Sequence, residues 1–279
     1  GKPISHSLSP LIQMTIAKEM GIDFVYSAFH IEESLEEAVK GAYALGISGL
    51  NITIPFKQEV MSYLLELSDE AKVIGAVNTL LRINGGYKGY NTDVYGIKKA
   101  LEKADINIKK KDIVLLGAGG AAKAVLYVCA KEGVESVSLI SRDINKAKVL
   151  SESVKASFPD IKLNFIKLSE LEARGLINEY LPKNNYIAFQ ASPVGMHPDV
   201  NKAIIECKDF YDKCEAGMDL VYNPSQTKFM QYFIDDNKKV INGLNMLIYQ
   251  GIRAFELWNG IEVGEEIVLK LRQLLMLDK

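Results

Sequence analysis

Lys57 is the side chain whose type and position first suggest chemistry. It follows Pro55 in what the sequence predicts as the first turn of a helix. A cation at that end opposes the helix dipole, at a cost of about 0.3–1 kcal/mol. The same field favours the neutral amine, the form that takes up a proton. The preceding strand places Asn51 and Thr53 on one face, which favours a reactive lysine over a solvated one.

A carboxylate is expected near a predicted β-hairpin. Turn residues at 84–86 separate two β-rich stretches. A loop at 84–85 sets Asn78 opposite Asn91, whereas a loop at 85–86 sets it opposite Asp93. Either register brings Asn78 beside Asp93. Asp93 also suits the N-cap of the helix that follows, and the two roles are compatible.

A glycine-rich turn predicts a dinucleotide site. The apolar run 112–116 leads into a G-x-G-x-x-A sequence, and a helix is expected to follow. The first glycine permits the tight turn, the second lets a pyrophosphate approach the backbone, and the helix N-terminus attracts phosphate. A purely structural turn is the less favoured alternative. The expected cofactor contacts here are Gly117, Ala118, Gly119, Gly120 and Ala121.

The end of the next strand indicates which dinucleotide is bound. An NAD site needs a carboxylate there to accept a hydrogen bond from the ribose 2′-OH. This chain has Ser141, Arg142 and Asp143 instead. Arg142 can pair with a 2′-phosphate in a charge-assisted fork, so NADP is favoured. Asp143 could repel that phosphate or hold a ribose, which keeps NAD as a possible cofactor, and a surface salt bridge is the alternative for Arg142.

Two serines near the start could bind a carboxylate. Ser9 is expected to be an N-cap, with Pro10 at the first helical position. Ser7 and Ser9, with the helix N-terminus, could bind a small carboxylate. The residues alone leave capping and binding evenly balanced.

The elements that must position these residues form two α/β units. Alternating strands and helices at 25–31, 32–45, 47–54 and 55–67 predict a parallel sheet with crossovers. A polar connection is expected at 107–111. Strands are predicted near 112–116, 136–141, 161–166, 186–190, 216–221 and 239–241, and a helical tail at 245–277 is broken near Gly260.

Composition narrows the class of protein. Of the 279 residues, 48% are hydrophobic, which excludes a disordered protein. The net charge of −2 argues against a nucleic-acid binder, which would carry a basic surface. Three cysteines cannot form a disulfide framework and lack metal-site spacing, so we expect a cytoplasmic protein without a metal. No secretory signal or membrane segment is expected. The chain begins at Gly1 and not with methionine, as it would if a short N-terminal stretch were missing.

Taken together, these segments resemble the shikimate dehydrogenase family over essentially the whole chain. The matching stretches are Gly1-Lys-Pro-Ile-Ser-His-Ser-Leu-Ser-Pro10, Asn51-Ile-Thr-Ile-Pro-Phe-Lys57, Gly75-Ala-Val-Asn-Thr79, Gly89-Tyr-Asn-Thr-Asp93, Gly117 to Ala122, Ala191-Ser-Pro-Val-Gly-Met196, Asp219-Leu-Val-Tyr-Asn-Pro224 and Asn242-Gly-Leu-Asn-Met-Leu-Ile-Tyr-Gln250.

The resemblance implies an α/β, two-domain fold. An N-terminal α/β substrate domain, 1–100, is completed by C-terminal helices in 240–279 that pack back on it, and 101–239 form a Rossmann-like NADP-binding domain. The implied reaction is the reversible NADP-dependent reduction of 3-dehydroshikimate to shikimate, in aromatic amino-acid biosynthesis. Hydride would cross the cleft between the domains. The protein would act as a monomer or homodimer.

The resemblance also implies residue roles. A Lys–Asp pair at the reacting carbinol maps onto Lys57 and Asp93. Substrate contacts map onto Ser7, Ser9, Thr53, Lys57, Asn78, Asp93, Tyr222 and Gln250. Nicotinamide contacts map onto Leu220 and Gly243, with a weaker one at Asp69.

Some positions depart from the family's usual residues. Gln13 and Met14 replace His-Asn, Ser141 and Asp143 replace Asn and Thr, and Gln190 replaces Asn. Acidic residues near the adenine ribose are typical of relatives that use quinate and NAD, so a quinate/shikimate dehydrogenase is one alternative. A non-catalytic NADP-binding sensor is another, although it would have no need of the Lys–Asp pair.

Overall fold

The computed structural model describes residues 1–2, 4, 7–171 and 176–277. Its helices are α1 (Ser9–Met20), α2 (Leu35–Ala44), the 3-10 helix η1 (Glu59–Tyr63), α3 (Asp69–Ile74), α4 (Asp93–Lys103), α5 (Gly120–Glu132), α6 (Ile144–Ser157), α7 (Leu168–Leu171), α8 (Ile177–Tyr180), α9 (Lys208–Asp212), α10 (Lys228–Asp235), α11 (Leu244–Asn259) and α12 (Glu265–Leu277). Its strands are β1 (Gly49–Asn51), β2 (Glu66–Leu67), β3 (Thr79–Ile83), β4 (Gly86–Tyr90), β5 (Asp112–Leu116), β6 (Ser136–Ser141), β7 (Leu163–Lys167), β8 (Tyr186–Gln190), β9 (Cys214–Asp219) and β10 (Lys239–Ile241).

The chain divides into two compact units. The first comprises residues 1–96 and 245–279, and the second comprises 97–244. The chain passes from the first unit to the second inside α4 and returns to the first at the start of α11. Residues 107–111, expected to connect the two domains, therefore lie within the second unit. That the first unit binds the substrate and the second the cofactor stays a prediction at this point.

The first unit contains a mixed sheet of four strands in the order β1-β3-β4-β2. β1 pairs with β3, and β3 with β4, in antiparallel fashion, and β2 alone pairs in parallel, with β4. The parallel sheet expected for this half is therefore wrong. The β3–β4 hairpin makes one pair antiparallel, because two antiparallel strands need only a short loop and no crossover, and β1 also pairs with β3 in the antiparallel sense.

Two elements expected in the first unit are also wrong. The described residues 22–33 contain no strand, since Phe24 and Tyr26 pack on Phe255 and Trp258 of α11 and not on a neighbouring strand. The helix expected at 55–67 is a turn, then η1 and β2. The Leu65 N–H donates to the Tyr87 carbonyl at 2.9 Å, which draws this stretch into the sheet.

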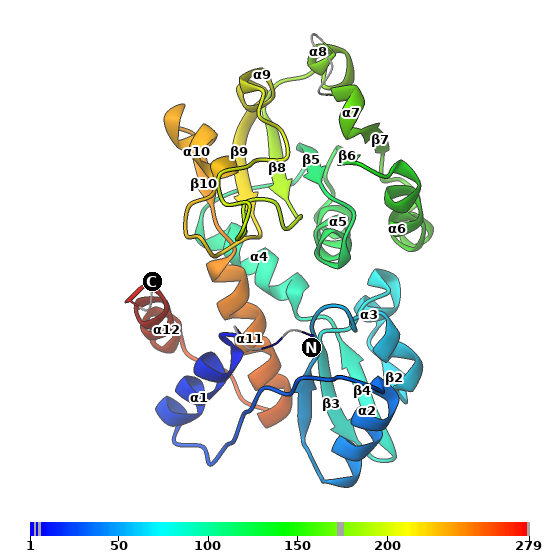
Figure 1. Ribbon diagram of the computed structural model, residues 1–279, viewed down its shortest axis with the longest axis vertical. Helices are drawn as coiled ribbons and strands as arrows, with labels where there is room; N and C mark the ends of the chain where they lie inside the picture. The colour runs from blue at the N-terminus through cyan, green and yellow to red at the C-terminus, as the bar shows by residue number, and fades with distance from the viewer. Residues whose placement is uncertain (3, 5–6, 172–175, 278–279) are drawn as a thin grey trace. The chain divides into compact units, whose positions relative to one another are not determined.

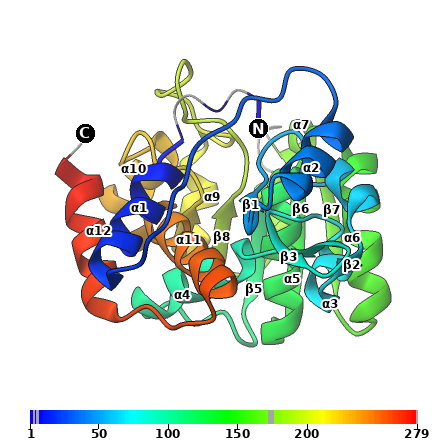
Figure 2. The same ribbon diagram turned by 90° about the horizontal axis from the view of Figure 1, so that it is seen from below.

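Helices from both ends of the chain pack together in the first unit. Figures 1 and 2 both show α1 beside α12, and these two helices are in contact. Buried Gln13 of α1 donates from Nε2 to the Gly251 carbonyl of α11 at 2.9 Å. Residues 245–279 thus belong to the same compact unit as residues 1–96, and that they complete a substrate domain stays a prediction.

The second unit contains six parallel strands in the order β10-β9-β8-β5-β6-β7. In chain order this is the doubly wound Rossmann arrangement, which places ligands at the carboxyl ends of the strands. α5 and α6 pack along β5 to β7, and α9 and α10 pack against β9 and β10 (Figure 1). Ile113 to Leu116 of β5 are fully buried, as a central parallel strand requires.

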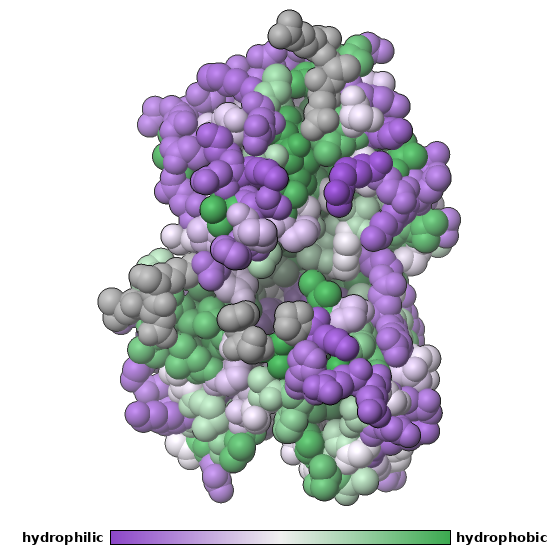
Figure 3. All heavy atoms as spheres, viewed as in Figure 1, coloured by the Kyte–Doolittle hydropathy of each residue, from purple (hydrophilic) through white to green (hydrophobic). Residues whose placement is uncertain are grey.

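Hydrophilic side chains cover much of the face drawn in Figure 3, with smaller apolar patches between them. Within the described part of the chain, no helix has the length and apolar character needed to cross a membrane.

Candidate functional site

An ion pair joins Lys57 and Asp93 in the first unit. Lys57 Nζ lies 2.6 Å from Asp93 Oδ2, and the two side chains are 21% and 7% exposed. An ion pair this close and this sheltered interacts more strongly than an exposed one. The ammonium group has three donors, so Lys57 can hold Asp93 and still contact a second oxygen.

The local backbone around Lys57 differs from the sequence expectation. β1 ends at Asn51, and residues 54–58 form a turn before η1, so Lys57 does not lie in the first turn of a helix. Its carbonyl accepts from the Val77 N–H at 2.7 Å, which fixes the turn against the start of the hairpin. The lysine is thus placed by backbone pairing and by Asp93.

The hairpin register determines what meets Asp93. Thr79 pairs with Tyr90 and Ile83 with Gly86, so the loop is 84–85. Of the two registers that the sequence left open, this is the one that sets Asn78 opposite Asn91. Asn78 still reaches Asp93, since its Nδ2 donates to Asp93 Oδ1 at 2.9 Å.

Asn78 is held on both ends of its amide. Its Oδ1 accepts from the Thr92 N–H at 2.8 Å and from the Thr79 hydroxyl at 3.0 Å. A backbone N–H can only donate, so Oδ1 must face Thr92, and the NH₂ group turns toward Asp93. Gln250 Oε1 of α11 also lies 3.4 Å from that NH₂ group. Four separate stretches of the chain therefore converge on Asn78 and Asp93.

Other candidate substrate contacts are less tightly connected. Helix α1 begins at Ser9 itself, with Leu8 at the cap position, so Ser9 is not the N-cap. The Ser9 N–H donates to Ser7 Oγ at 3.3 Å. Thr53 makes no side-chain hydrogen bond to the described residues, and Tyr222 belongs to the second unit, where burial raises its pKa. Pro3, Ser5 and His6 of the matching N-terminal segment lie outside the described residues.

The glycine turn of the second unit runs from β5 into α5, as the sequence predicts. Gly117 has φ +109° and its amide donates to the Ile140 carbonyl at 2.9 Å. Gly119 is different, because its φ is −96° and a Cβ there would meet nothing within 4 Å. The protein's own packing does not require glycine at 119 or at 120, where a Cβ also meets open space. Space before a helix N-terminus fits a dinucleotide phosphate.

This contrast predicts different outcomes at the two glycines. Gly119→Ala should change the free energy of unfolding by less than about 1 kcal/mol and weaken NADP⁺ binding by at least about tenfold, because the methyl occupies the space of the pyrophosphate. Gly117→Ala should destabilise the fold by roughly 1–3 kcal/mol, since a Cβ there lies 3.0 Å from the Ala191 carbonyl oxygen. Thermal unfolding and fluorescence titration with NADP⁺ check both. Unchanged NADP⁺ affinity in Gly119→Ala would contradict a phosphate site here.

The turn after β6 exposes Arg142. Ser141 Oγ donates to the Asp143 carbonyl at 2.7 Å and accepts from the Asp143 N–H at 3.0 Å. Asp143 caps α6, its Oδ1 accepting from the N–H groups of Asn145 and Lys146. Arg142 is exposed and forms no ion pair with the described residues. The arginine is therefore available to a ligand phosphate, while the carboxylate of Asp143 is engaged in capping.

Buried polar side chains shape the loops at the carboxyl ends of β8 and β9. Gln190 Oε1 accepts from the Ser192 N–H at 2.7 Å, and Nε2 donates to the Val194 carbonyl at 2.8 Å. Asp219 is fully buried and accepts from the Thr227 hydroxyl at 2.5 Å and from the Val221 N–H at 2.9 Å.

The two candidate nicotinamide contacts lie together, Leu220 directly after β9 and Gly243 after β10. The Gly243 amide donates to the Val221 carbonyl at 3.0 Å. A Cβ at Gly243 would lie 2.1 Å from the Leu220 carbonyl oxygen, so this close approach requires glycine. The Asp219 loop thus positions both Leu220 and Gly243.

Burial raises the pKa of Asp219 from its ordinary 3.8 to about 7. A carboxyl with a raised folded-state pKa stabilises the fold most below pH 4, and this contribution is lost as the pH rises to about 7. Asp219→Asn removes the charge; its amide oxygen can still accept from the Val221 N–H, while its NH₂ group faces the Thr227 hydroxyl oxygen as a donor. Its melting temperature should therefore fall less than that of the parent between pH 5 and pH 8. Parallel pH profiles of the two melting temperatures would contradict the raised pKa.

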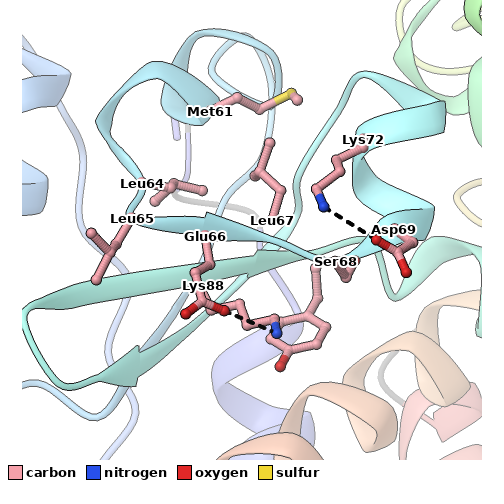
Figure 4. Close-up of a pocket in the computed structure, with 10 residues that line it drawn as sticks. Met61, Leu64, Leu65, Glu66, Leu67, Ser68, Asp69, Lys72 and Lys88 are labelled. Atoms are coloured by element: carbon pink, nitrogen blue, oxygen red, sulfur yellow. Dashed lines mark hydrogen bonds and ion pairs between the residues drawn. The ribbon is translucent and has the colours of Figure 1, made fainter.

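A cavity of about 730 Å³ lies apart from the Lys57–Asp93 pair. Figure 4 shows its lining, with ion pairs between Lys72 and Asp69 and between Lys88 and Glu66. Asp69 is fully exposed at the start of α3. The lining includes neither Lys57 nor Asp93, so volume alone does not identify the reacting centre here.

Sequence reasoning missed two side chains that support the site. Tyr26 donates to Asn51 Oδ1 at 2.9 Å, and burial raises its pKa to about 12, which keeps it protonated. Thr79, fully buried, contacts both Asn51 and Asn78. The signal that could have identified Thr79 is a hydroxyl side chain on a buried strand. Tyr26 was missed because it lies in residues 25–31, which the sequence predicted to be a strand.

Family models match both ends of the chain. Residues 1–80 match the shikimate dehydrogenase substrate binding domain, and residues 243–271 match the shikimate 5'-dehydrogenase C-terminal domain. A curated relative from Caldanaerobacter subterraneus subsp. tengcongensis, named shikimate dehydrogenase (NADP(+)), is 41% identical over 93% of this chain and 90% of its own. One of that name from Clostridium perfringens is 39% identical over 98% of this chain and 96% of its own.

Solved structures resemble the whole chain. Shikimate 5-dehydrogenase from Listeria monocytogenes, in complex with shikimate and NAD, has a TM-score of 0.88 at 29% identity, with 98% of this chain and 93% of the other covered. The Thermus thermophilus enzyme with NADP(H) and shikimate has a TM-score of 0.80 at 30% identity, with 97% and 95% covered. Quinate dehydrogenase from Corynebacterium glutamicum, in complex with NAD, has a TM-score of 0.84 at 26% identity, with 98% and 95% covered. On this similarity over nearly its full length, the chain belongs to the shikimate dehydrogenase family.

Proposed function

We propose that the protein catalyses the reversible NADP-dependent reduction of 3-dehydroshikimate to shikimate. The observation that carries this proposal is the Lys57–Asp93 pair, 2.6 Å apart and mostly sheltered, with Asn78 and Gln250 beside it. A pyridine-nucleotide sensor would not need an amine and a carboxylate held together in this way. The relatives' names supply the substrate and the cofactor.

The chemistry needs a group that handles a proton at the reacting oxygen. NADP, when bound, carries the hydride that is exchanged with the substrate carbon. Lys57 donates a hydrogen bond, and then a proton, to the oxygen on which negative charge develops during reduction. In the reverse direction Lys57 takes that proton back. Asp93 keeps Lys57 oriented and accepts from the same substrate hydroxyl.

The remaining residues bind and orient the substrate. Ser7 and Ser9 at the start of α1 hold its carboxylate, and Thr53, Asn78, Gln250 and Tyr222 meet its ring hydroxyls or carboxylate. The second unit holds the cofactor at Gly117–Ala121, with Leu220 and Gly243 at the nicotinamide and a weaker contact at Asp69. Arg142 holds the 2′-phosphate with Ser141 and Asp143 in its turn, which favours NADP. We place the enzyme in the cytoplasm, for which the three free cysteines are the support. We propose that it acts as a monomer or homodimer.

Steady-state assays with two substrates and two cofactors test the proposal. Absorbance at the nicotinamide band should rise fastest with shikimate and NADP⁺. Strong turnover of quinate with NAD⁺ would instead support the quinate/shikimate dehydrogenase alternative. No absorbance change in any combination over a range of pH would support a sensor and overturn the proposed reaction.

A further inference from the structure

A continuous set of hydrogen bonds extends from Tyr26 to the catalytic pair. The Tyr26 hydroxyl donates to Asn51 Oδ1, and Asn51 Nδ2 donates to Thr79 Oγ1 at 3.0 Å. The Thr79 hydroxyl donates to Asn78 Oδ1 at 3.0 Å. Asn78 Nδ2 then donates to Asp93 Oδ1, and Asp93 Oδ2 accepts from Lys57.

Thr79 is the central member of this set. A hydroxyl has one proton and two lone pairs. The proton of Thr79 goes to Asn78 Oδ1, while its oxygen accepts from Asn51 Nδ2 and lies 3.2 Å from the Thr92 hydroxyl. Thr79 is 0% exposed, so no water can replace it without a rearrangement of the strand.

Thr79 also fixes where the Asn78 amide lies. The Thr92 N–H sets which way the amide faces, and the Thr92 hydroxyl lies 3.2 Å from Asn78 Oδ1 and 3.0 Å from Asn78 Nδ2. All of these contacts come from one residue, so the Thr79 hydroxyl adds an independent donor to the same oxygen, and the NH₂ group is aimed at Asp93 Oδ1. Since Asp93 Oδ2 holds Lys57, a displacement of Asn78 is passed on to the ammonium group.

We propose that Thr79 is a positioning residue for the reaction, acting through Asn78 on the Asp93–Lys57 pair without touching the substrate. This inference rests on the proposed function. It assigns to a buried strand hydroxyl a role in turnover in addition to its role in stability.

The test compares Thr79→Val, which removes the hydroxyl at similar volume, with Thr79→Ser, which keeps it. One neutral hydrogen bond corresponds to roughly a tenfold change. Thr79→Val should lower kcat with shikimate about tenfold and leave the Kd for NADP⁺ unchanged, and Thr79→Ser should restore kcat to within about twofold. Thr79→Ala gives the same comparison if Thr79→Val does not fold.

A double-mutant cycle separates positioning from stability. Because Thr79 acts through Asn78, Thr79→Val should cause no further loss of kcat in an Asn78→Ala background. Equal kcat in the parent and in Thr79→Val, or an independent tenfold loss in the Asn78→Ala background, would overturn the inference. If the parent itself does not oxidise shikimate, the proposed function fails, which is distinct from a failure at Thr79.

Discussion

Lys57→Ala should lower kcat for shikimate oxidation by about 10²–10⁴-fold, the range typical of a lost general acid or base. The variant keeps Asp93 and Asn78 but has no group to exchange a proton with the substrate oxygen. The glycine turn and Arg142 lie in the other unit, so the Kd for NADP⁺ should stay within about twofold of the parent. Steady-state kinetics and fluorescence titration with NADP⁺ measure the two quantities.

Lys40→Ala is a matched control for this substitution. Lys40 also lies in the first unit and pairs with a carboxylate, Glu36, but both side chains are exposed on α2. An exposed pair contributes little, so the control should retain the parent's kcat. Comparable kcat values for Lys57→Ala and Lys40→Ala would exclude Lys57 from the chemical step.

Arg142→Ala should raise the Kd for NADP⁺ by roughly 10–150-fold, because hydrogen bonds to a charged group contribute about 1.5–3 kcal/mol. The 2′-phosphate is the difference between the two cofactors, so the Kd for NAD⁺ should change little. Arg142 is exposed and Asp143 is engaged in capping α6, so the substitution should not disturb the fold.

Lys148→Ala, on the exposed face of α6, controls for a general loss of positive charge. It should leave both dissociation constants within about twofold of the parent, since screened charges away from a phosphate act weakly. An equal loss of NADP⁺ and NAD⁺ affinity in Arg142→Ala would mean that Arg142 supports the turn and does not read the 2′-phosphate.

The sequence predicted the second sheet well and the first poorly, for a physical reason. Central parallel strands such as β5 are buried on both faces and appear as continuous apolar runs whatever their partners. The stretch 25–31 has similar composition, but whether it becomes a strand depends on which element it packs against. Phe24 and Tyr26 meet aromatic rings of α11, a helix that lies more than two hundred residues later in the sequence.

In the candidate site, too, some features follow from local sequence and others depend on tertiary packing. Lys57 was singled out through a helix that does not form, and its partner depends on the hairpin register, which the turn sequence left open between two loops. The role of Asp143, in contrast, follows from local sequence, since an Asp directly before a helix is a favoured N-cap, and Asp143 caps α6. The two N-caps that were expected are wrong, because Ser9 and Asp93 are themselves the first residues of α1 and α4. Local sequence therefore explains the Asp143 cap, whereas the exact helix starts and the side-chain partners required the tertiary fold.

A crystal structure of the protein with shikimate bound is the most direct measurement of the central claim. The account predicts one ring hydroxyl oxygen within hydrogen-bond distance of both Lys57 Nζ and the Asp93 carboxylate, with the substrate carboxylate near Ser7 and Ser9. Shikimate bound with its carboxylate on Lys57, or bound away from both side chains, would contradict it.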